Sequence, residues 1–335
     1  QPCKAFPSSH LNVLLALGHR LDGLVGPPSP HLRAATQREH CESADSPDQF
    51  ESPNYGTLTT PVIEWHFVTH PEGGLTKLGL SAWPEEKILD AGRRRLPRPL
   101  SSFMPQLKRV NSQLHKLESR APISEEELIC TRMYTGPLFV KYNAVLRGVR
   151  SKCTRQFARW FASCKGNRYA TSLHIINTAV NKLSQLTQAT CVYRGISGGL
   201  LPASFWQPNA FHVRGGVEGA FMSCTRDYSV ALAYASSSSG GAGVVFELTQ
   251  GFVDRGASLD WLSMYSFEQE ILLPPLSSLE VQSTRVDGGT LVVTCRVSVN
   301  LTNDPIDLVV SKRQVPPARG QLTRLGRKQS QTIAH

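Results

Sequence analysis

Two glutamates, Glu268 and Glu270, stand one residue apart directly before an apolar run, Ile271 to Pro275. Side chains at positions i and i+2 of a β-strand point to the same face of the sheet. Two carboxylates on one face repel each other, and this repulsion raises their pKa values. Such pairs typically serve general acid–base chemistry or stabilise a developing positive charge. A solvated pair on an edge strand is the alternative interpretation of the same pattern.

Polar residues with ligand-binding chemistry lie at the ends of two earlier apolar runs. Arg194 and Gly195 end one run; Ser223 and Thr225 end the other, with Cys224 between them. Each feature alone is compatible with ordinary structure, such as an exposed arginine at a strand end or a strand-to-helix junction capped by threonine. The ordered set of Arg, Ser-x-Thr and Glu-x-Glu, each at the boundary of a predicted strand, indicates a site.

Helices are predicted before the strand that carries Arg194. Ser124 followed by three glutamates is a helix-start signal. Gly136 and Pro137 should end that helix. Between Leu173 and Leu186, apolar residues recur at steps of three and four, which fits one face of a helix. The block 124–188 is therefore predicted to be helical.

Short runs of β-type composition follow, with one amphipathic helix over 226–235. The runs are 190–195, 219–225, 242–250, 268–275, 278–286 and 290–299. Helices followed by a sheet of five or six strands define an α+β fold class.

The first 120 residues have mixed composition. Residues 20–60 show no sustained period, so we predict loop or disorder there. Pro61–Thr69 has the composition of a strand. The basic, proline-containing stretch Arg93–Pro99 is predicted to be a solvated connector, because a nucleic-acid patch would require interleaved aromatic residues or a recognised module.

Composition limits the class of protein. The chain has 335 residues, 40% of them hydrophobic and 19% charged, which is enough apolar material for a sizeable core. The net charge is +10. Much of it comes from the basic residues of the C-terminal tail: Lys312, Arg313, Arg319, Arg324, Arg327 and Lys328.

Localisation signals are weak. No stretch approaches the roughly 18 apolar residues that span a bilayer, and the apolar run Leu11–Leu17 is short for a signal peptide. Their absence favours the cytoplasm and leaves the compartment unassigned. The eight cysteines form no Cys-x-x-Cys pair, so we expect reduced thiols and no metal site.

In order and in strand context, the Arg194, Ser223-x-Thr225 and Glu268-x-Glu270 set resembles the R-S-E class of mono-ADP-ribosyltransferases. The resemblance is closest to the arginine-modifying branch, which has glutamate at the first E-x-E position. Upstream, "YTGPLFVKYNAVLR" looks like the helical region that precedes the NAD core of the family. One departure is cysteine at the middle of Ser-x-Thr, where it points away from the two hydroxyls.

The resemblance implies a domain organisation. Residues 1–120 would be an N-terminal region of unknown role. Residues 121–302 would be the catalytic domain, with a helical part (121–188) before a split, mixed β-sheet NAD core (189–302). Residues 303–335 would be a basic tail.

The resemblance also assigns roles in binding NAD+, the implied co-substrate. Arg194 would bind a phosphate or the ribose. The backbone at Gly195 would contact the nicotinamide amide. Ser223 would hold Glu270 in place, and Thr225 would support the same wall of the NAD+ site.

For catalysis, the resemblance implies that Glu270 stabilises positive charge at the anomeric carbon. Glu268 would orient the acceptor guanidinium and help to deprotonate it. For the aromatic residues Tyr193, Phe221 and Tyr234, stacking on nicotinamide is conceivable, but we expect core packing.

The implied enzyme is an NAD+–protein-arginine ADP-ribosyltransferase whose partner is a protein with an exposed arginine. An NAD glycohydrolase and a catalytically silent binding module of the same fold remain alternatives. We expect a monomer without a specific nucleic-acid partner, and the basic tail offers weak contact with anionic membranes.

Overall fold

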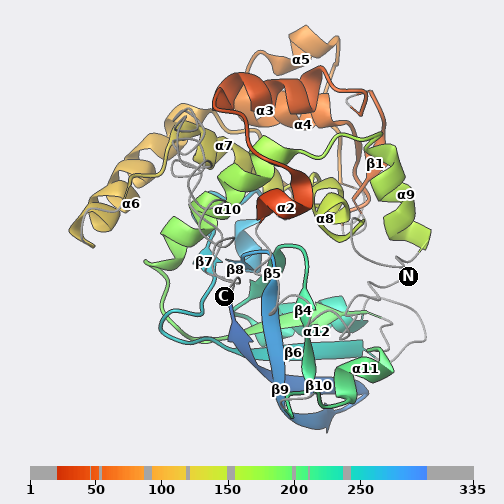
Figure 1. The fold of residues 1–335 in the computed structure, drawn as a ribbon. Helices are drawn as coiled ribbons and strands as arrows, with labels where there is room; N and C mark the ends of the chain where they lie inside the picture. The colour runs from red at the N-terminus through yellow and green to blue at the C-terminus, as the bar shows by residue number, and fades with distance from the viewer. Residues whose placement is uncertain are drawn as a thin grey trace, which may run out of the picture.

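The computed structural model describes residues 21–45, 47–52, 55–86, 93–117, 121–148, 155–197, 201–209, 212–236 and 243–299. The candidate signal run and the basic tail lie outside these residues. A layer of helices lies on one side of a strongly twisted sheet (Figure 1). This is the predicted α+β class, with helices before strands.

The predicted helical block is confirmed. It contains α7 (Glu125–Tyr134), α8 (Phe139–Gly148), α9 (Arg155–Ser163) and α10 (Ala170–Ser184). Ser124 forms a complete capping box with Glu127 at the start of α7, so two otherwise unpaired backbone N–H groups are satisfied at that helix end.

All six strands predicted over 190–299 are present in one eight-stranded sheet of order β4-β9-β10-β6-β3-β5-β8-β7. They are β3 (Cys191–Ile196), β5 (Met222–Thr225), β6 (Gly243–Thr249), β8 (Glu270–Leu273), β9 (Ser277–Asp287) and β10 (Thr290–Ser298). Two short strands absent from the prediction complete the sheet: β4 (Gly215–Glu218) and β7 (Ala257–Ser258).

The sheet is mixed and is nearly divided at its centre. β10 pairs with β6 in parallel, whereas the other neighbouring strands are antiparallel. β3 and β5 pair only through Tyr193 and Thr225. The helices α11 (Ala203–Trp206) and α12 (Tyr228–Ser236) accompany the strands, and α12 packs against β3.

The N-terminal region is more ordered than its sequence predicts. The predicted loop over 20–60 contains α2 (Leu21–Val25), α3 (Leu32–Cys41) and a two-stranded sheet of β1 (Phe50–Glu51) and β2 (Leu58–Thr59). The loop prediction is wrong for these elements, because packing against the rest of the protein stabilises segments that lack a clear period.

The strand predicted over 61–69 is also wrong: it is the helix α4 (Pro61–Thr69). The Thr60 side chain accepts a hydrogen bond from the Ile63 N–H, and Pro61 occupies the first turn. Both are helix-start signals, and here they override the β-type composition of the following residues.

The remaining N-terminal elements are α5 (Gly74–Leu78), the 3₁₀ helix η1 (Leu100–Phe103) and α6 (Met104–Lys116). Buried residues of the N-terminal region share a hydrophobic cluster with α7, α8 and α10. The Glu39 carboxylate accepts hydrogen bonds from the N–H groups of Thr171 and Ser172 in the first turn of α10. A side chain from α3 thereby accepts hydrogen bonds from backbone N–H groups that would otherwise be unpaired at the start of α10.

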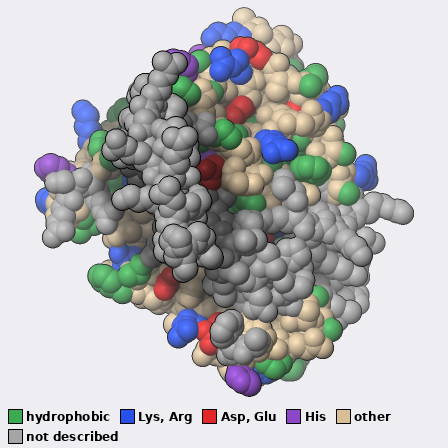
Figure 2. All heavy atoms as spheres, viewed as in Figure 1, with side chains coloured by type: hydrophobic (Ala, Val, Ile, Leu, Met, Phe, Trp, Pro, Cys, Tyr) green, Lys and Arg blue, Asp and Glu red, His purple; other side chains and the backbone are tan. Residues whose placement is uncertain are grey.

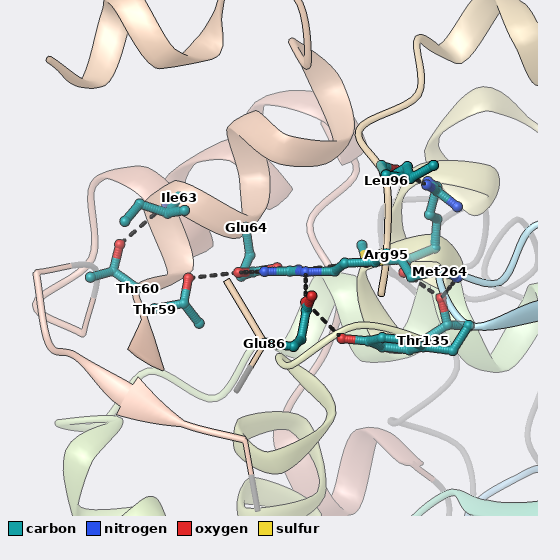
Figure 3. A network of polar contacts seen from close by, with 11 residues as sticks. Thr59, Thr60, Ile63, Glu64, Glu86, Arg95, Leu96, Thr135 and Met264 are labelled. Carbon is teal, nitrogen blue, oxygen red and sulfur yellow. Dashed lines mark hydrogen bonds and ion pairs between the residues drawn. The ribbon is translucent and has the colours of Figure 1, made fainter. Parts of the chain in front are cut away.

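The predicted solvated connector over 93–99 contains a buried cation. The Arg95 guanidinium pairs with both Glu64 oxygens and donates from Nε to Glu86 at 2.8 Å (Figure 3). It also lies over the Phe67 ring, 4.4 Å from its centroid. The prediction is therefore wrong at Arg95, because two carboxylates and an aromatic face replace water around its charge.

On the face drawn in Figure 2, the coloured Lys and Arg side chains are scattered and do not form one patch. Among the helices of the described residues, none is long and apolar enough to cross a membrane. The six cysteines within the described ranges are free thiols.

Candidate active site

Adjacent antiparallel strands bring Ser223 and Glu270 together. β5 and β8 pair with Thr225 opposite Glu270 and Ser223 opposite Leu272. Met222 and Cys224 lie in the hydrophobic cluster on one face, so Ser223 and Thr225 point to the other face with Glu270. The Ser223 hydroxyl donates a hydrogen bond of 2.7 Å to Glu270 Oε1.

Glu268 lies outside the strand. It ends the 3₁₀ helix η2 (Ser266–Glu268), and Gln269 then adopts the left-handed conformation with φ 47° and ψ 51°. The expectation that the two glutamates share a strand face is therefore wrong. The turn at Gln269 gives the two carboxylates separate surroundings: Glu270 is 5% exposed, whereas Glu268 is half-buried.

The predicted rise in both pKa values is present, but its main cause is different. Burial raises the pKa of Glu270 to about 8, and the negative charge of Glu268 adds to this rise. Burial also raises the pKa of Glu268, while hydrogen bonds from Tyr234 and Tyr55 oppose the rise. Desolvation thus outweighs the carboxylate repulsion that the sequence suggested.

Two tyrosine hydroxyls hold Glu268, and no sequence motif placed either tyrosine in the site. The hydroxyls of Tyr55 and Tyr234 both donate to Glu268 Oε1. Core packing was expected for Tyr234, and its hydroxyl contact with Glu268 corrects that expectation. Its place on the predicted helix 226–235 gave no indication of this contact. For Tyr55 there was no local signal, since 213 positions separate it from Glu268.

Arg194 approaches the same strands across the narrow join between β3 and β5. Its Nη1 donates to the Ser223 carbonyl oxygen at 2.8 Å. Its buried Nε has no hydrogen-bond partner among the described residues. The Arg194 side chain as a whole is half-buried, and its planar set of cationic donors suits an anionic group such as a phosphate.

Gly195 is required by packing. A Cβ atom at this position would lie 1.9 Å from the Ala231 carbonyl oxygen and 2.8 Å from the Ala235 nitrogen, both in α12. Only glycine allows the helix to approach β3 so closely. Thr225 has a local role as well: its Oγ1 accepts the Asp227 N–H at the turn before α12.

Other side chains near the site are structural. Burial raises the pKa of Cys224 to about 12, so it stays a thiol. Phe221 is fully buried and packs edge-on against Tyr134, as expected. Tyr193 contacts Tyr228 edge-on, with ring centroids 5.3 Å apart. Within the described ranges, no group of three or more His, Cys, Asp or Glu side chains could hold a metal ion.

Solved structures with a similar fold have low sequence identity to this chain. The Vis toxin, an ADP-ribosyltransferase from Vibrio splendidus, is 18% identical over 59% of this chain and 82% of that one, with a TM-score of 0.40. The ADP-ribosyltransferase HopU1 of Pseudomonas syringae pv. tomato DC3000 is 21% identical over 61% and 89%, with a TM-score of 0.43. The eucaryotic mono-ADP-ribosyltransferase ART2.2 is 16% identical over 58% and 77%, with a TM-score of 0.33.

The sequence itself matches a family model. No curated protein matches the chain significantly. The model described as "ART: NAD:arginine ADP-ribosyltransferase" matches residues 101–299, which is more than half of the chain and includes every predicted site residue. The chain therefore belongs to the NAD:arginine ADP-ribosyltransferase family.

Proposed function

We propose that this protein transfers a single ADP-ribose from NAD+ to the arginine side chain of an acceptor protein and releases nicotinamide. The observation that carries the proposal is the buried Glu270 carboxylate, held by Ser223 at 2.7 Å, with the charge of Glu268 close enough to raise its pKa. This arrangement suits a reaction in which a cation develops at one carboxylate while a cationic acceptor binds at another.

The described residues fit a dinucleotide. NAD+ carries two phosphates, and the half-buried Arg194 guanidinium offers cationic donors for one of them or for the ribose. Arg194 Nη1 already donates to the Ser223 carbonyl oxygen, so the side chain is oriented before substrate binds. The Gly195 backbone lies beside it and would contact the nicotinamide amide, and Thr225 supports the wall opposite Glu270.

Cleavage breaks the bond between the nicotinamide nitrogen and the anomeric carbon of ribose. The bonding electron pair leaves with nicotinamide, and the ribose becomes oxocarbenium-like. Ionised Glu270 would stabilise this positive charge and bind a ribose hydroxyl. Ser223 favours the ionised form, because its hydroxyl donates to the carboxylate.

Transfer then forms a bond between an arginine guanidinium nitrogen and the anomeric carbon, and that nitrogen loses one proton. Guanidinium is cationic and poorly nucleophilic, so a carboxylate beside it serves both binding and deprotonation. Half-buried Glu268 would supply this carboxylate.

The test is incubation of the full chain with labelled NAD+ and agmatine, a small guanidinium acceptor, followed by mass spectrometry of the product. Wild type should attach one ADP-ribose to the guanidinium and release one nicotinamide. Glu270→Ala should abolish both, whereas it should still bind NAD+ through Arg194. Absence of label on agmatine with wild type, or full activity of Glu270→Ala, would overturn the proposal.

A further inference from the structure

We infer that Tyr55, which lies outside the segment matched by the family model, is a positioning residue for Glu268 and favours arginine over water as the acceptor of ADP-ribose. This inference rests on the proposed function, because it requires Glu268 to serve the acceptor. It gives the N-terminal region a part in the reaction of the C-terminal half.

Two phenols converge on one oxygen of Glu268. The hydroxyls of Tyr55 and Tyr234 both donate to Oε1 and lie 3.3 Å from each other. Both hydroxyls donate to Oε1, so two hydrogen bonds orient the carboxylate. An incoming guanidinium would find the carboxylate already fixed, which lowers the entropic cost of orienting it.

The ring of Tyr55 is held rigidly. It stacks on Tyr265 with centroids 4.0 Å apart and an interplanar angle of 19°. The following residue, Gly56, has φ 61°, and its N–H donates to the Ser52 carbonyl in the turn between β1 and β2. Only 5% of Tyr55 is exposed, and a buried tyrosine hydroxyl requires a partner. Here the Tyr55 hydroxyl donates to Glu268 and also lies at hydrogen-bond distance from the Tyr234 hydroxyl.

The backbone before Glu268 has its own anchors in α7 and at the residue that caps its C-terminal end. Arg132 donates from Nη1 to the Leu262 carbonyl oxygen at 2.7 Å, and the Met264 N–H donates to Thr135 Oγ1 at 3.0 Å. The 3₁₀ helix η2 is therefore placed by residues inside the family segment. The Tyr55 hydroxyl adds an interaction with the Glu268 side chain itself, which is why we assign it to orientation of the carboxylate.

The buried Arg95 cluster, made of Arg95, Glu64 and Glu86, also fixes Tyr265, the ring on which Tyr55 stacks. The Tyr265 hydroxyl donates to Glu86 Oε1 at 3.2 Å. Glu86 also accepts from Arg95 (Figure 3). The buried Arg95 cluster and the acceptor carboxylate are thus joined through two stacked rings. The N-terminal region supplies both the cluster and the phenol that reaches Glu268.

The test is Tyr55→Phe in the full chain, which keeps the stacked ring and removes one oxygen atom. We expect the rate of transfer to agmatine to fall about tenfold, since a hydrogen bond to a charged group is lost. Hydrolysis of NAD+ by water and the Kd for NAD+ should change less than about twofold, because neither uses Glu268.

Two further variants separate orientation from stability. Tyr234→Phe removes the other donor to the same oxygen and should give the same selective loss of transfer. Tyr228→Phe removes a phenol that donates to Asp287 on the polar surface and should leave transfer and hydrolysis unchanged. A merely structural role of Tyr55 would lower transfer and hydrolysis together, along with the melting temperature.

Failure of this inference is distinguishable from failure of the proposed function. If wild type modifies agmatine and Tyr55→Phe keeps the wild-type ratio of transfer to hydrolysis, Tyr55 has no positioning role and the proposed function stands. If wild type modifies no guanidinium at all, both fail.

Discussion

Ser223 Oγ lies 2.7 Å from Glu270 Oε1 and donates to it between two adjacent antiparallel strands. The carboxylate is almost completely buried, so this hydroxyl is a strong influence in favour of its ionised form. The protonation state of Glu270 therefore depends on the Ser223 hydroxyl. Removal of this hydroxyl should not disturb the apolar packing of β5, because Ser223 points to the opposite face from Met222 and Cys224.

Ser223→Ala should slow cleavage of NAD+ about tenfold or more, because a hydrogen bond to a charged group contributes roughly 1.5–3 kcal/mol. Loss of the donor also raises the pKa of Glu270 further, so the activity profile should move to higher pH. Nicotinamide release measured across pH checks both effects. The matched control is Ser278→Ala, since that hydroxyl donates to Ser298 on the exposed part of the sheet. A profile unchanged in Ser223→Ala would contradict the assignment.

Glu268→Gln should separate transfer from hydrolysis. The amide keeps the size of the side chain but loses the charge that binds and deprotonates guanidinium, so transfer to agmatine should fall by about a hundredfold or more. Hydrolysis of NAD+ should persist. Glu280→Gln, at a surface ion pair with Arg296, is the control. Equal loss of both activities would place Glu268 in NAD+ cleavage, and hydrolysis without transfer in wild type would favour the glycohydrolase alternative.

Activity should rise with pH. Burial and the Glu268 charge raise the pKa of Glu270 to about 8, whereas Arg194 and the Ser223 hydroxyl oppose this rise. The ionised carboxylate is the form that stabilises an oxocarbenium-like state. Consequently kcat/KM for NAD+, which reports the free enzyme, should increase through neutral pH and level off above about 8. Stopped assays of nicotinamide release from pH 6 to pH 9 test this, and a plateau already reached at the acid end is the opposing result.

The same carboxylate should make stability depend on pH. Its pKa is about 8 in the folded protein, against the ordinary value of 4.5 that we expect in the unfolded chain. Between these values the folded state binds more protons than the unfolded state, so the free energy of unfolding falls as pH rises. Glu270→Gln removes this dependence and should stabilise the protein little near pH 5 but by on the order of a few kcal/mol near pH 9. Urea unfolding at both pH values measures it. A gain equal at both pH values would show that Glu270 is not the group responsible.

The buried N-terminal cation should be essential to stability. Arg95→Met leaves Glu64 and Glu86 without their shared partner, which should cost about 3–5 kcal/mol in the free energy of unfolding. The adjacent Arg94 forms an exposed 3.6 Å pair with Glu85, so Arg94→Met should cost less than about 1 kcal/mol. Denaturant unfolding of the two variants compares them directly. Similar losses at both positions would mean that burial at Arg95 has no special effect.

Much of the fold could be predicted because its signals are local. The capping box at Ser124 and the spacing of apolar residues on α10 depend on neighbours within one or two helical turns. Strand composition located the six strands predicted over 190–299 but failed over 61–69. Helix α4 also has a local signal, Thr60 followed by Pro61, and this helix start outweighs the β-branched and aromatic residues that follow.

The candidate site could likewise be predicted only in part from the sequence. The positions of Arg194, Ser223 and Glu270 at strand ends predicted that these residues lie together, and hydrogen bonds join Ser223 to both of the others. Glu268 lies in the 3₁₀ helix η2, outside the predicted strand. Their electrostatics were predicted in direction but not in cause. Desolvation of a carboxylate depends on everything that covers it, and no pair of positions in the sequence encodes that.

Only the tertiary structure shows that the N-terminal region joins the site. Tyr55 reaches Glu268 and Arg95 reaches Glu64 and Glu86 across long stretches of chain. Arg95 lies in a basic, proline-containing segment whose composition predicts exposure to solvent. Burial becomes favourable there because distant elements supply carboxylates and an aromatic face at hydrogen-bonding and van der Waals distance. Such partners are brought together by packing of the whole core. Local pattern therefore predicts the candidate site residues, while long-range packing decides what surrounds and orients them.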